Sequence, residues 1–157
     1  MSALTINIDL PPESQALIQR FRDAPQELPQ AIKRGMDRAL EVVASRIQEK
    51  RLAGRGPFPP AEHRLGERTG QLRQSVRATP ATITGNEITG AIGTPVIYGR
   101  VHEFGFQGTV RYRTKTGKSA TRKMNVPERA PFRTGAEENK DYIRDTIGTE
   151  IVTSLPK

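Results

Sequence analysis

The stretch PQELPQAIKRGMDRALEVVASRIQEKRL, residues 25–52, carries the longest regular pattern in the chain. Apolar residues recur in it at every third or fourth position, at Leu28, Ile32, Met36, Ala39, Leu40, Val43 and Ile47. This spacing predicts one long amphipathic helix with its apolar side on a core. Pro29 falls in the first turn, where a missing N–H costs little, and Gly54 stands where the helix should end.

Shorter elements are expected before and after this helix. Residues 5–10 alternate polar with apolar side chains, as a strand with one buried face does, and residues 14–22 have the spacing of a short helix. Residues 54–70 are rich in glycine and proline and have no hydrophobic period, so they should form an extended loop. Residues 71–76 then make a short helical turn that bears Leu72.

A hairpin is expected after the loop. Residues 76–84 and 87–93 have the composition of two strands, joined by Gly85 and Asn86. The residues expected on its packed faces are Thr82, Ile83, Ile88, Ala91 and Ile92.

The last third of the chain should contain two helices. Ile97, Val101 and Phe104 are spaced as one face of a short helix, which Gly105 should end. Residues 126–132 are a proline-punctuated approach to a C-terminal amphipathic helix. The apolar residues of that helix are Ala136, Ile143, Ile147 and Ile151, and its first turns hold the acidic residues Glu137, Glu138 and Asp141.

Together these elements predict an α+β fold in which a small antiparallel sheet packs on a long N-terminal helix and a C-terminal helix. A chain of 157 residues has the size of one ordinary domain, so residues 1–157 are expected to form a single domain. Within it, residues 1–24 provide the N-terminal strand and short helix, and residues 108–125 form an inserted basic arm.

Composition excludes several classes of protein. The chain has no cysteine, which removes a disulfide framework, a thiolate metal site and a cysteine nucleophile. No segment approaches the roughly 20 apolar residues that span a bilayer, so no membrane partner is expected. The net charge of +8 favours contact with polyanions or with an acidic protein surface.

Residues 108–125 concentrate this charge, because they contain six basic residues and no acidic one around a Thr116–Gly117 turn signal. The basic residues are Arg111, Arg113, Lys115, Lys118, Arg122 and Lys123. The pattern predicts an exposed basic hairpin or flexible arm. Three interpretations stay open: a small basic DNA-binding module that contacts phosphates, contact with an acidic neighbouring protein, or a solvated hairpin without a partner.

Few residues offer catalytic chemistry. The chain has two histidines, His63 and His102, and the best candidate pair is His102 with Glu103. Adjacent positions on a helix point about 100° apart, so this pair cannot hold one metal ion as two histidines at i and i+4 do. No phosphate-binding loop, dinucleotide-binding glycine pattern or nucleophile elbow occurs. We therefore expect no catalytic, metal-binding or cofactor-binding residues, and a hydrolase or nuclease centred on this pair is kept only as a hypothesis for test by His102→Ala.

Three segments, in this order, resemble one known family. They are LGERTGQLRQSV at residues 65–76, IYGRVHEFG at residues 97–105 and VPERAPF at residues 126–132. Their order and spacing, with a long helix before them and another after, resemble the virion-morphogenesis or tail-completion proteins of tailed phages. The N-terminal strand and the basic arm fall outside the resemblance.

The resemblance implies a structural virion protein and not an enzyme. Such proteins are tail-completion or neck subunits, of the tail-terminator or the head–tail joining type, that assemble into a ring, commonly a hexamer, at the head-proximal end of the tail. The implied partners are further copies of the chain, the tail tube protein and the head–tail connector or stopper protein, with DNA passing through the lumen. The protein would be made in the host bacterial cytoplasm and end in the virion, with no cofactor.

The same segments contain residues expected at an interface or in a packing motif. They are Tyr98, His102, Glu103, Phe104, Gly105, Arg129, Pro131 and Phe132. In the interface interpretation Phe104 is an apolar anchor and Gly105 allows a sharp exit from the helix. His102 and Glu103 then form hydrogen bonds at the interface rim. In the packing interpretation the aromatic residues of the set belong, with Val101, to the core.

Overall fold

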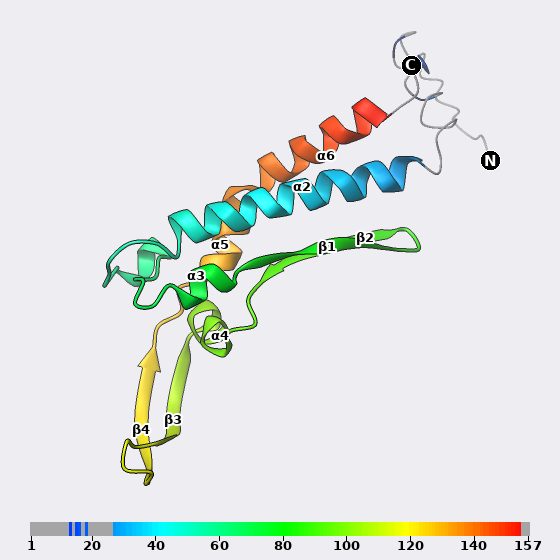
Figure 1. The fold of residues 1–157 in the computed structure, drawn as a ribbon. Coiled ribbons are helices and arrows are strands. Elements are labelled where there is room, and N and C mark those ends of the chain that lie inside the picture. The colour runs from blue at the N-terminus through cyan, green and yellow to red at the C-terminus, as the bar shows by residue number, and fades with distance from the viewer. Residues whose placement is uncertain (1–12, 14, 17, 19–26, 155–157) are drawn as a thin grey trace, which may run out of the picture.

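The computed structural model of the chain describes residues 27–154, together with residues 13, 15, 16 and 18 (Figure 1). The elements in chain order are α2 (Glu27–Lys50), the 3-10 helix η1 (Pro60–Glu62), α3 (Gln71–Ser75), β1 (Arg77–Thr84), β2 (Glu87–Gly93), α4 (Ile97–Phe104), β3 (Phe106–Arg113), β4 (Ser119–Val126), α5 (Pro131–Glu138) and α6 (Lys140–Ser154). The strand predicted at residues 5–10 lies outside the described residues, as does most of the short helix predicted at residues 14–22. The helices and the antiparallel hairpins confirm the predicted α+β class.

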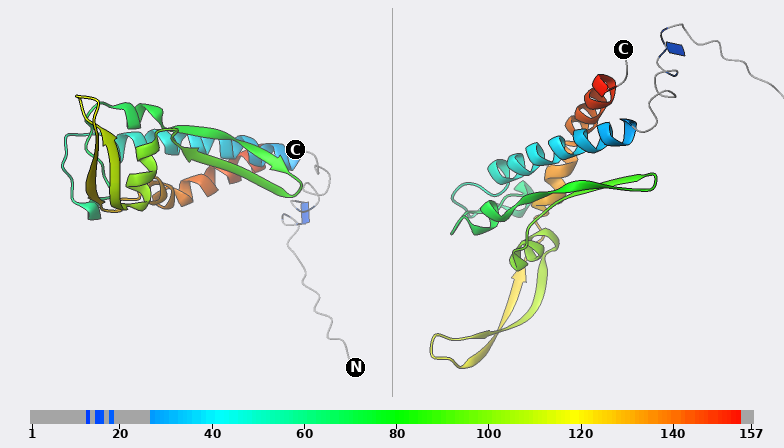
Figure 2. Two further views of the ribbon diagram at one scale, coloured as in Figure 1. Left: turned by 90° about the horizontal axis from the view of Figure 1, so that it is seen from below. Right: turned by 45° about the vertical axis from the view of Figure 1, so that its right-hand side comes forward.

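The long predicted helix is α2, and it packs along α6 (Figures 1 and 2). Its buried positions are mostly small residues: Ala31, Gly35, Ala39, Val43, Ala44 and Ile47. A Cβ added at Gly35 would lie 2.8 Å from the Cα of Ile147 in α6, so glycine is what permits the two backbones to approach this closely. Arg38 of α2 also forms an ion pair with Glu150 of α6 at 2.5 Å. The helix pair therefore depends on a row of small residues that the apolar period alone does not reveal.

The predicted C-terminal helix is in fact two helices, α5 and α6, which are separated at Asn139. Asn139 is buried, and its Nδ2 donates to the Gly135 carbonyl at 2.8 Å while its Oδ1 accepts from Arg46 of α2 at 2.5 Å. A short amide side chain that bonds to nearby backbone competes with continuation of a helix. The first of the two helices begins earlier than expected, at Pro131, because proline suits the first helical turn. Ala136, expected on the apolar side, is exposed.

The hairpin β1–β2 lies against α2 (Figure 2). Its strands pair around the predicted turn, but the register shifts between Thr79 and Thr82. The extra residue lies in β1 and moves the in–out alternation of that strand by one residue, so Ala81 is buried and Thr82 is exposed, contrary to the prediction. Ala91 of β2 is also exposed, because neighbouring strand residues point to opposite faces and Ile92 beside it is half-buried. The isoleucines expected on the packed side are half-buried, as predicted. A Cβ at Gly90 would lie 2.4 Å from Cδ1 of Leu40, which shows how closely β2 approaches the helix.

Asp37 of α2 ties this hairpin to the helix. Its carboxylate accepts a hydrogen bond from the N–H of Ala81 at 2.5 Å and forms an ion pair with Lys33 at 2.6 Å. The hydrogen bond from Lys33, and after it the one from the backbone of Ala81, hold the pKa of Asp37 below its ordinary 3.8. The carboxylate therefore stays charged at neutral pH and holds the bulged strand on α2.

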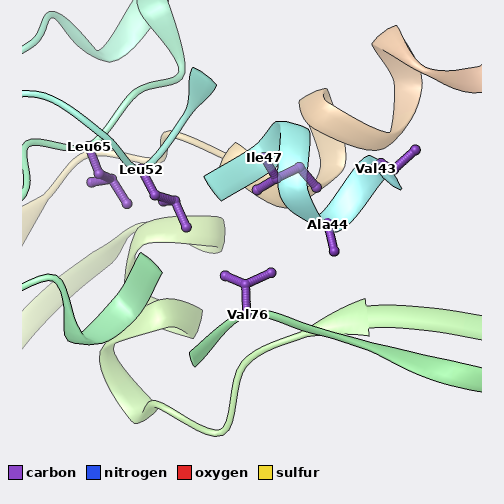
Figure 3. Packing of buried hydrophobic residues seen from close by; sticks show 6 residues of the cluster. All are labelled: Val43, Ala44, Ile47, Leu52, Leu65 and Val76. Atoms are coloured by element: carbon purple, nitrogen blue, oxygen red, sulfur yellow. The ribbon is translucent and has the colours of Figure 1, made fainter. Parts of the chain in front are cut away.

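The core lies where the end of α2 meets the following loop and the start of β1 (Figure 3). It consists of Val43, Ala44, Ile47, Leu52, Leu65 and Val76. Phe132 and Ile143 pack against it from the C-terminal helices. The loop expected to be extended thus folds back and contributes Leu65 to the core, because an apolar side chain gains free energy from burial.

The basic segment forms the second hairpin, β3–β4, as predicted. Its strands extend two residues beyond the predicted start and one beyond the predicted end, from Phe106 to Val126. Figure 1 shows this hairpin projecting away from α2 and α6, with α4 near its base. We refer to residues 106–126 as the arm.

Candidate assembly site

Glu103, on the inner side of α4, caps the first turn of α5. One carboxylate oxygen accepts the N–H of Phe132 and the other accepts the N–H of Arg133, both at 2.9 Å. The residue is only 9% exposed. A carboxylate at a helix N-terminus satisfies N–H groups that have no partner within the helix, and it interacts favourably with the helix dipole. Both oxygens are thus engaged inside the chain, while a hydrogen bond from Glu103 at an interface rim stays a prediction.

The backbone at the end of α4 joins the same approach segment. The His102 carbonyl accepts the N–H groups of Arg129 and Ala130, at 3.0 and 3.3 Å. Gly105 leaves the helix with a φ of 72°, and an added Cβ there would lie 3.0 Å from the Glu128 nitrogen. Both the positive φ and the close backbone favour glycine, which gives α4 the sharp exit expected of it.

Arg129 connects the loop of residues 54–70 to this junction. Its Nη1 donates to the carbonyls of Phe58 and Arg64, at 2.7 and 2.9 Å. Its own carbonyl lies 2.7 Å from Nδ1 of His63. Hydrogen bonds from a charged donor are stronger than neutral ones, so one side chain holds two points of the loop. The three segments that carry the resemblance therefore meet at one place: the first near this loop, the second in α4 and the third before α5.

A pocket of about 750 Å³ opens beside the junction, between the loop and α4. Its lining includes Leu52, Leu65, Leu72 and Tyr98 as apolar or aromatic side chains, and Arg68, Arg73 and Arg129 as cations. The carboxylate in the lining is that of Glu67, whose Oε1 lies 3.4 Å from Nη2 of Arg73. Three guanidinium groups against one carboxylate give the pocket a net positive charge.

The ring of His102 lies in the wall of this pocket, edge-on to Tyr98 with the ring centroids 6.4 Å apart. Burial, and after it the positive charge of Arg129, lower the pKa of His102 from its ordinary 6.5. Its Nδ1 is buried without a hydrogen-bond partner in the described part of the chain. General acid–base catalysis needs an oriented partner, and the neighbouring Glu103 is occupied as a cap, so this geometry does not favour the hydrolase or nuclease hypothesis.

Residues 27–154, with the few described before them, contain no cluster of three or more His, Asp or Glu side chains that could hold a metal ion. In the same residues, no helix is long and apolar enough to cross a membrane. The junction of α4, α5 and the loop of residues 54–70 is instead a packed structural unit, and two neighbouring surfaces are exposed: the outer face of α4 and the arm.

The outer face of α4 exposes apolar side chains. Ile97 is 88% exposed and Phe104 is 65% exposed, while Val101, which lies between them on the same face, is half-buried. Phe132 instead packs against the core. The packing interpretation therefore holds for Phe132 and fails for Phe104, whose ring lies at the surface. We call Ile97, Val101 and Phe104 the α4 stripe.

The arm has two different faces. One face is mainly apolar and consists of Phe106, Gly108, Val110, Tyr112, Ala120, Arg122, Met124 and Val126. The opposite face is polar and exposed throughout: Gln107, Thr109, Arg111, Arg113, Ser119, Thr121, Lys123 and Asn125. The period-two alternation of β3 is visible in the sequence and would have revealed these faces, which the charge count alone does not.

The sequence model of one protein family, described as "Bacteriophage HK97-gp10, putative tail-component", matches residues 15–105 of the chain. The match covers more than half of the 157 residues and includes the first two of the three resembling segments. It ends at Gly105, before the arm. No curated protein and no solved structure matches the chain.

Proposed function

Because the chain belongs to the HK97-gp10-like family of bacteriophage tail components, we propose that it is a tail-completion subunit. In this role it forms a ring, a hexamer, at the head-proximal end of the tail and joins the tail tube to the head connector. The family is one of structural tail components and not of enzymes, and a tail component assembles with other tail proteins. The tail tube protein and the connector or stopper protein are the partners we assign to the two sides of the ring.

The α4 stripe is the observation that supports this proposal. Ile97 and Phe104 are large apolar side chains, and a soluble monomer gains nothing by exposing both on one face of the same helix. They lie on a helix that Glu103 fastens to α5, so the stripe is presented on a fixed element. A subunit in a ring needs such a surface, since each copy must contact the next one through two different patches.

The experiment images tails assembled without the protein, with the wild type, and with two single variants, and scores tube length and head attachment. Phe104→Ser removes one of the two strongly exposed apolar side chains of the stripe and should leave tails like those made without the protein. Val152→Ser is the matched control, because Val152 is also 67% exposed but lies on α6. The same images give the number of copies in the ring. Identical tube length and head attachment with and without the protein would refute the neck role.

The alternative function, a small basic DNA-binding module, is favoured by one observation. The register places Arg111, Arg113 and Lys123 together on the exposed polar face of the arm, where phosphates of DNA passing through the ring lumen could bind them. Replacing all three by glutamine should reduce the slope of log affinity against log salt by about 3 if each neutralises one phosphate. An unchanged slope, or binding that does not depend on salt, would remove this function.

A further inference from the structure

Among the residues that the structure describes, none covers the apolar face of the arm enough to bury it. None of the residues 106–126 is buried, although the apolar ones on this face are mostly half-buried and those of the polar face are exposed. Figure 1 and the right-hand view of Figure 2 show that the hairpin points away from α2 and α6. An isolated two-stranded hairpin is marginally stable in water unless its apolar face packs on something. The arm should therefore be stabilised by another surface that packs against its apolar face.

The composition of the face indicates what that surface must be. Phe106 and Val126 pair across its base, and the Phe106 ring lies over Gly108, since a Cβ at Gly108 would be 3.1 Å from Cζ of that ring. Tyr112, 47% exposed, stands near the far end. Two cations, Lys115 and Lys118, occupy the turn beyond it. The partner must therefore offer an apolar strip and, next to it, negative charge.

The chain itself carries both features on its other surfaces. The α4 stripe provides exposed apolar side chains. The end of α5 and the start of α6 carry four carboxylates, Glu137, Glu138, Asp141 and Asp145, and two cations, Lys140 and Arg144. Arg51, after α2, forms an ion pair with Glu138, so the negative charge left for a partner lies on the other three carboxylates. The side chains of Asp141 and Asp145 are 81% and 70% exposed, and each forms an ion pair at 3.2 Å with Arg144, which is itself exposed. We call these four carboxylates the acidic corner.

We propose that the arm of one copy lies with its apolar face across the α4 stripe of the next copy, with Lys115 and Lys118 at that copy's acidic corner. Strands of eight residues span roughly 27 Å, enough to cross a short helix and reach the helices beyond it. The contact joins two different surfaces, so it repeats from copy to copy and closes when the rotation does. The proposal rests on the ring of the proposed function and specifies the surfaces between its subunits. It leaves the polar face, with Arg111 and Arg113, free to face the lumen or a partner.

Cross-linking between two differently tagged variants tests this contact in assembled tails, and the absence of cysteine makes each introduced thiol unique. One copy carries Ile97→Cys in the α4 stripe. The other carries Val110→Cys on the apolar face or, as the matched control, Thr109→Cys on the polar face one residue away. A short bismaleimide should join the 97–110 pair at least about tenfold more than the 97–109 pair, because neighbouring strand residues point to opposite faces.

The results separate the two proposals. If the protein sits on the tails as a ring but the 97–110 pair links no better than the 97–109 pair, the arm contact is overturned and the proposed function stands. If the wild-type protein, without introduced thiols, is absent from the tails, the proposed function fails and the arm contact fails with it. Preferential linking of the 97–110 pair within a ring supports both.

Charge reversal tests the choice of a second copy as the partner. The double change Lys115→Glu and Lys118→Glu should lower the amount of protein on tails. Adding Asp141→Lys and Asp145→Lys in the same chain should restore it, because opposite charges again face each other across the contact. If the lysine changes lower the amount of protein on tails and the aspartate changes do not restore it, the arm's turn does not bind the acidic corner of a second copy.

Discussion

Truncation of Glu103 tests the idea that this carboxylate holds the α4–α5 junction inside the protomer. Glu103→Ala removes the acceptors of the Phe132 and Arg133 N–H groups, both at 2.9 Å, from a site that is only 9% exposed. A hydrogen bond to a charged group contributes about 1.5–3 kcal/mol, and loss of a helix cap costs about 0.5–2 kcal/mol. Some water can enter at the helix end, so we expect a loss of about 3 kcal/mol in the free energy of unfolding.

Thermal and urea unfolding of the purified variants provide the assay. For a chain of this size about 1 kcal/mol corresponds to roughly 2–4 °C in Tm, so Glu103→Ala should lower Tm by about 6–12 °C. Glu128→Ala is the matched control, because Glu128 also pairs with Arg133 but both side chains are more than half exposed. An exposed pair of this kind contributes about 1 kcal/mol or less.

A small effect would refute the reasoning. If Glu103→Ala and Glu128→Ala change the free energy of unfolding equally, the cap does not stabilise the junction. If the Glu103 variant is as stable as the wild type but absent from assembled tails, the carboxylate acts at an interface, as the sequence first suggested.

Three further predictions concern packing, exposure and pH. Gly35→Ala should destabilise the protein by about 1–3 kcal/mol in urea unfolding, because the new Cβ meets the backbone of α6. Gly148→Ala should instead stabilise it by about 0.5–1 kcal/mol, because no atom of the described residues lies within 4 Å of the added Cβ. Equal effects of the two changes would contradict the close approach of α2 and α6. Phe132→Ala should cost about 2–4 kcal/mol in the same assay because its ring packs on the core, while Phe104→Ser should stay within about 0.5 kcal/mol of the wild type; a large loss in the second would place that ring in the core. Burial lowers the pKa of His102 below 6.5 in the folded protein, so the unfolded chain binds the proton more readily. The free energy of unfolding should therefore be highest above pH 6.5 and should fall as the pH drops below it, and His102→Gln should flatten this part of the profile. Parallel pH profiles for the wild type and the variant would contradict this prediction.

Elements whose signal is local were predictable from the sequence. The spacing of apolar residues predicts the long helix, and the turn residues Gly85 and Gly117 predict the two hairpins. What could not be predicted depends on partners far along the chain. Asn139 ends α5 while bonding to Arg46, a residue 93 positions away, and Arg129 holds carbonyls 71 and 65 positions before it. No window of neighbouring residues contains such a contact, so periodicity cannot reveal it.

The candidate site was predictable in its residues but not in their roles. Phe132 and Phe104 have similar sequence surroundings, aromatic residues close to a helix end, yet one packs on the core and the other is 65% exposed. The difference arises because α4 turns one side to α5, while its other side is left exposed by the described part of the chain. A helical spacing predicts which residues share a face, but it does not say whether that face is buried in the same chain or in a neighbouring one.

The order of residues in HEFG explains how one short segment can serve both folding and assembly. Successive side chains on a helix point about 100° apart, so Glu103 and Phe104 cannot face the same neighbour. Glu103 faces α5 and fastens α4 to it, which leaves Phe104 at the surface, and Gly105 then directs the chain into the arm. The inner residue therefore fixes the orientation of the outer one. It follows that a variant which loosens the cap should also weaken any contact made by the α4 stripe, whereas a variant of the stripe should leave the cap intact.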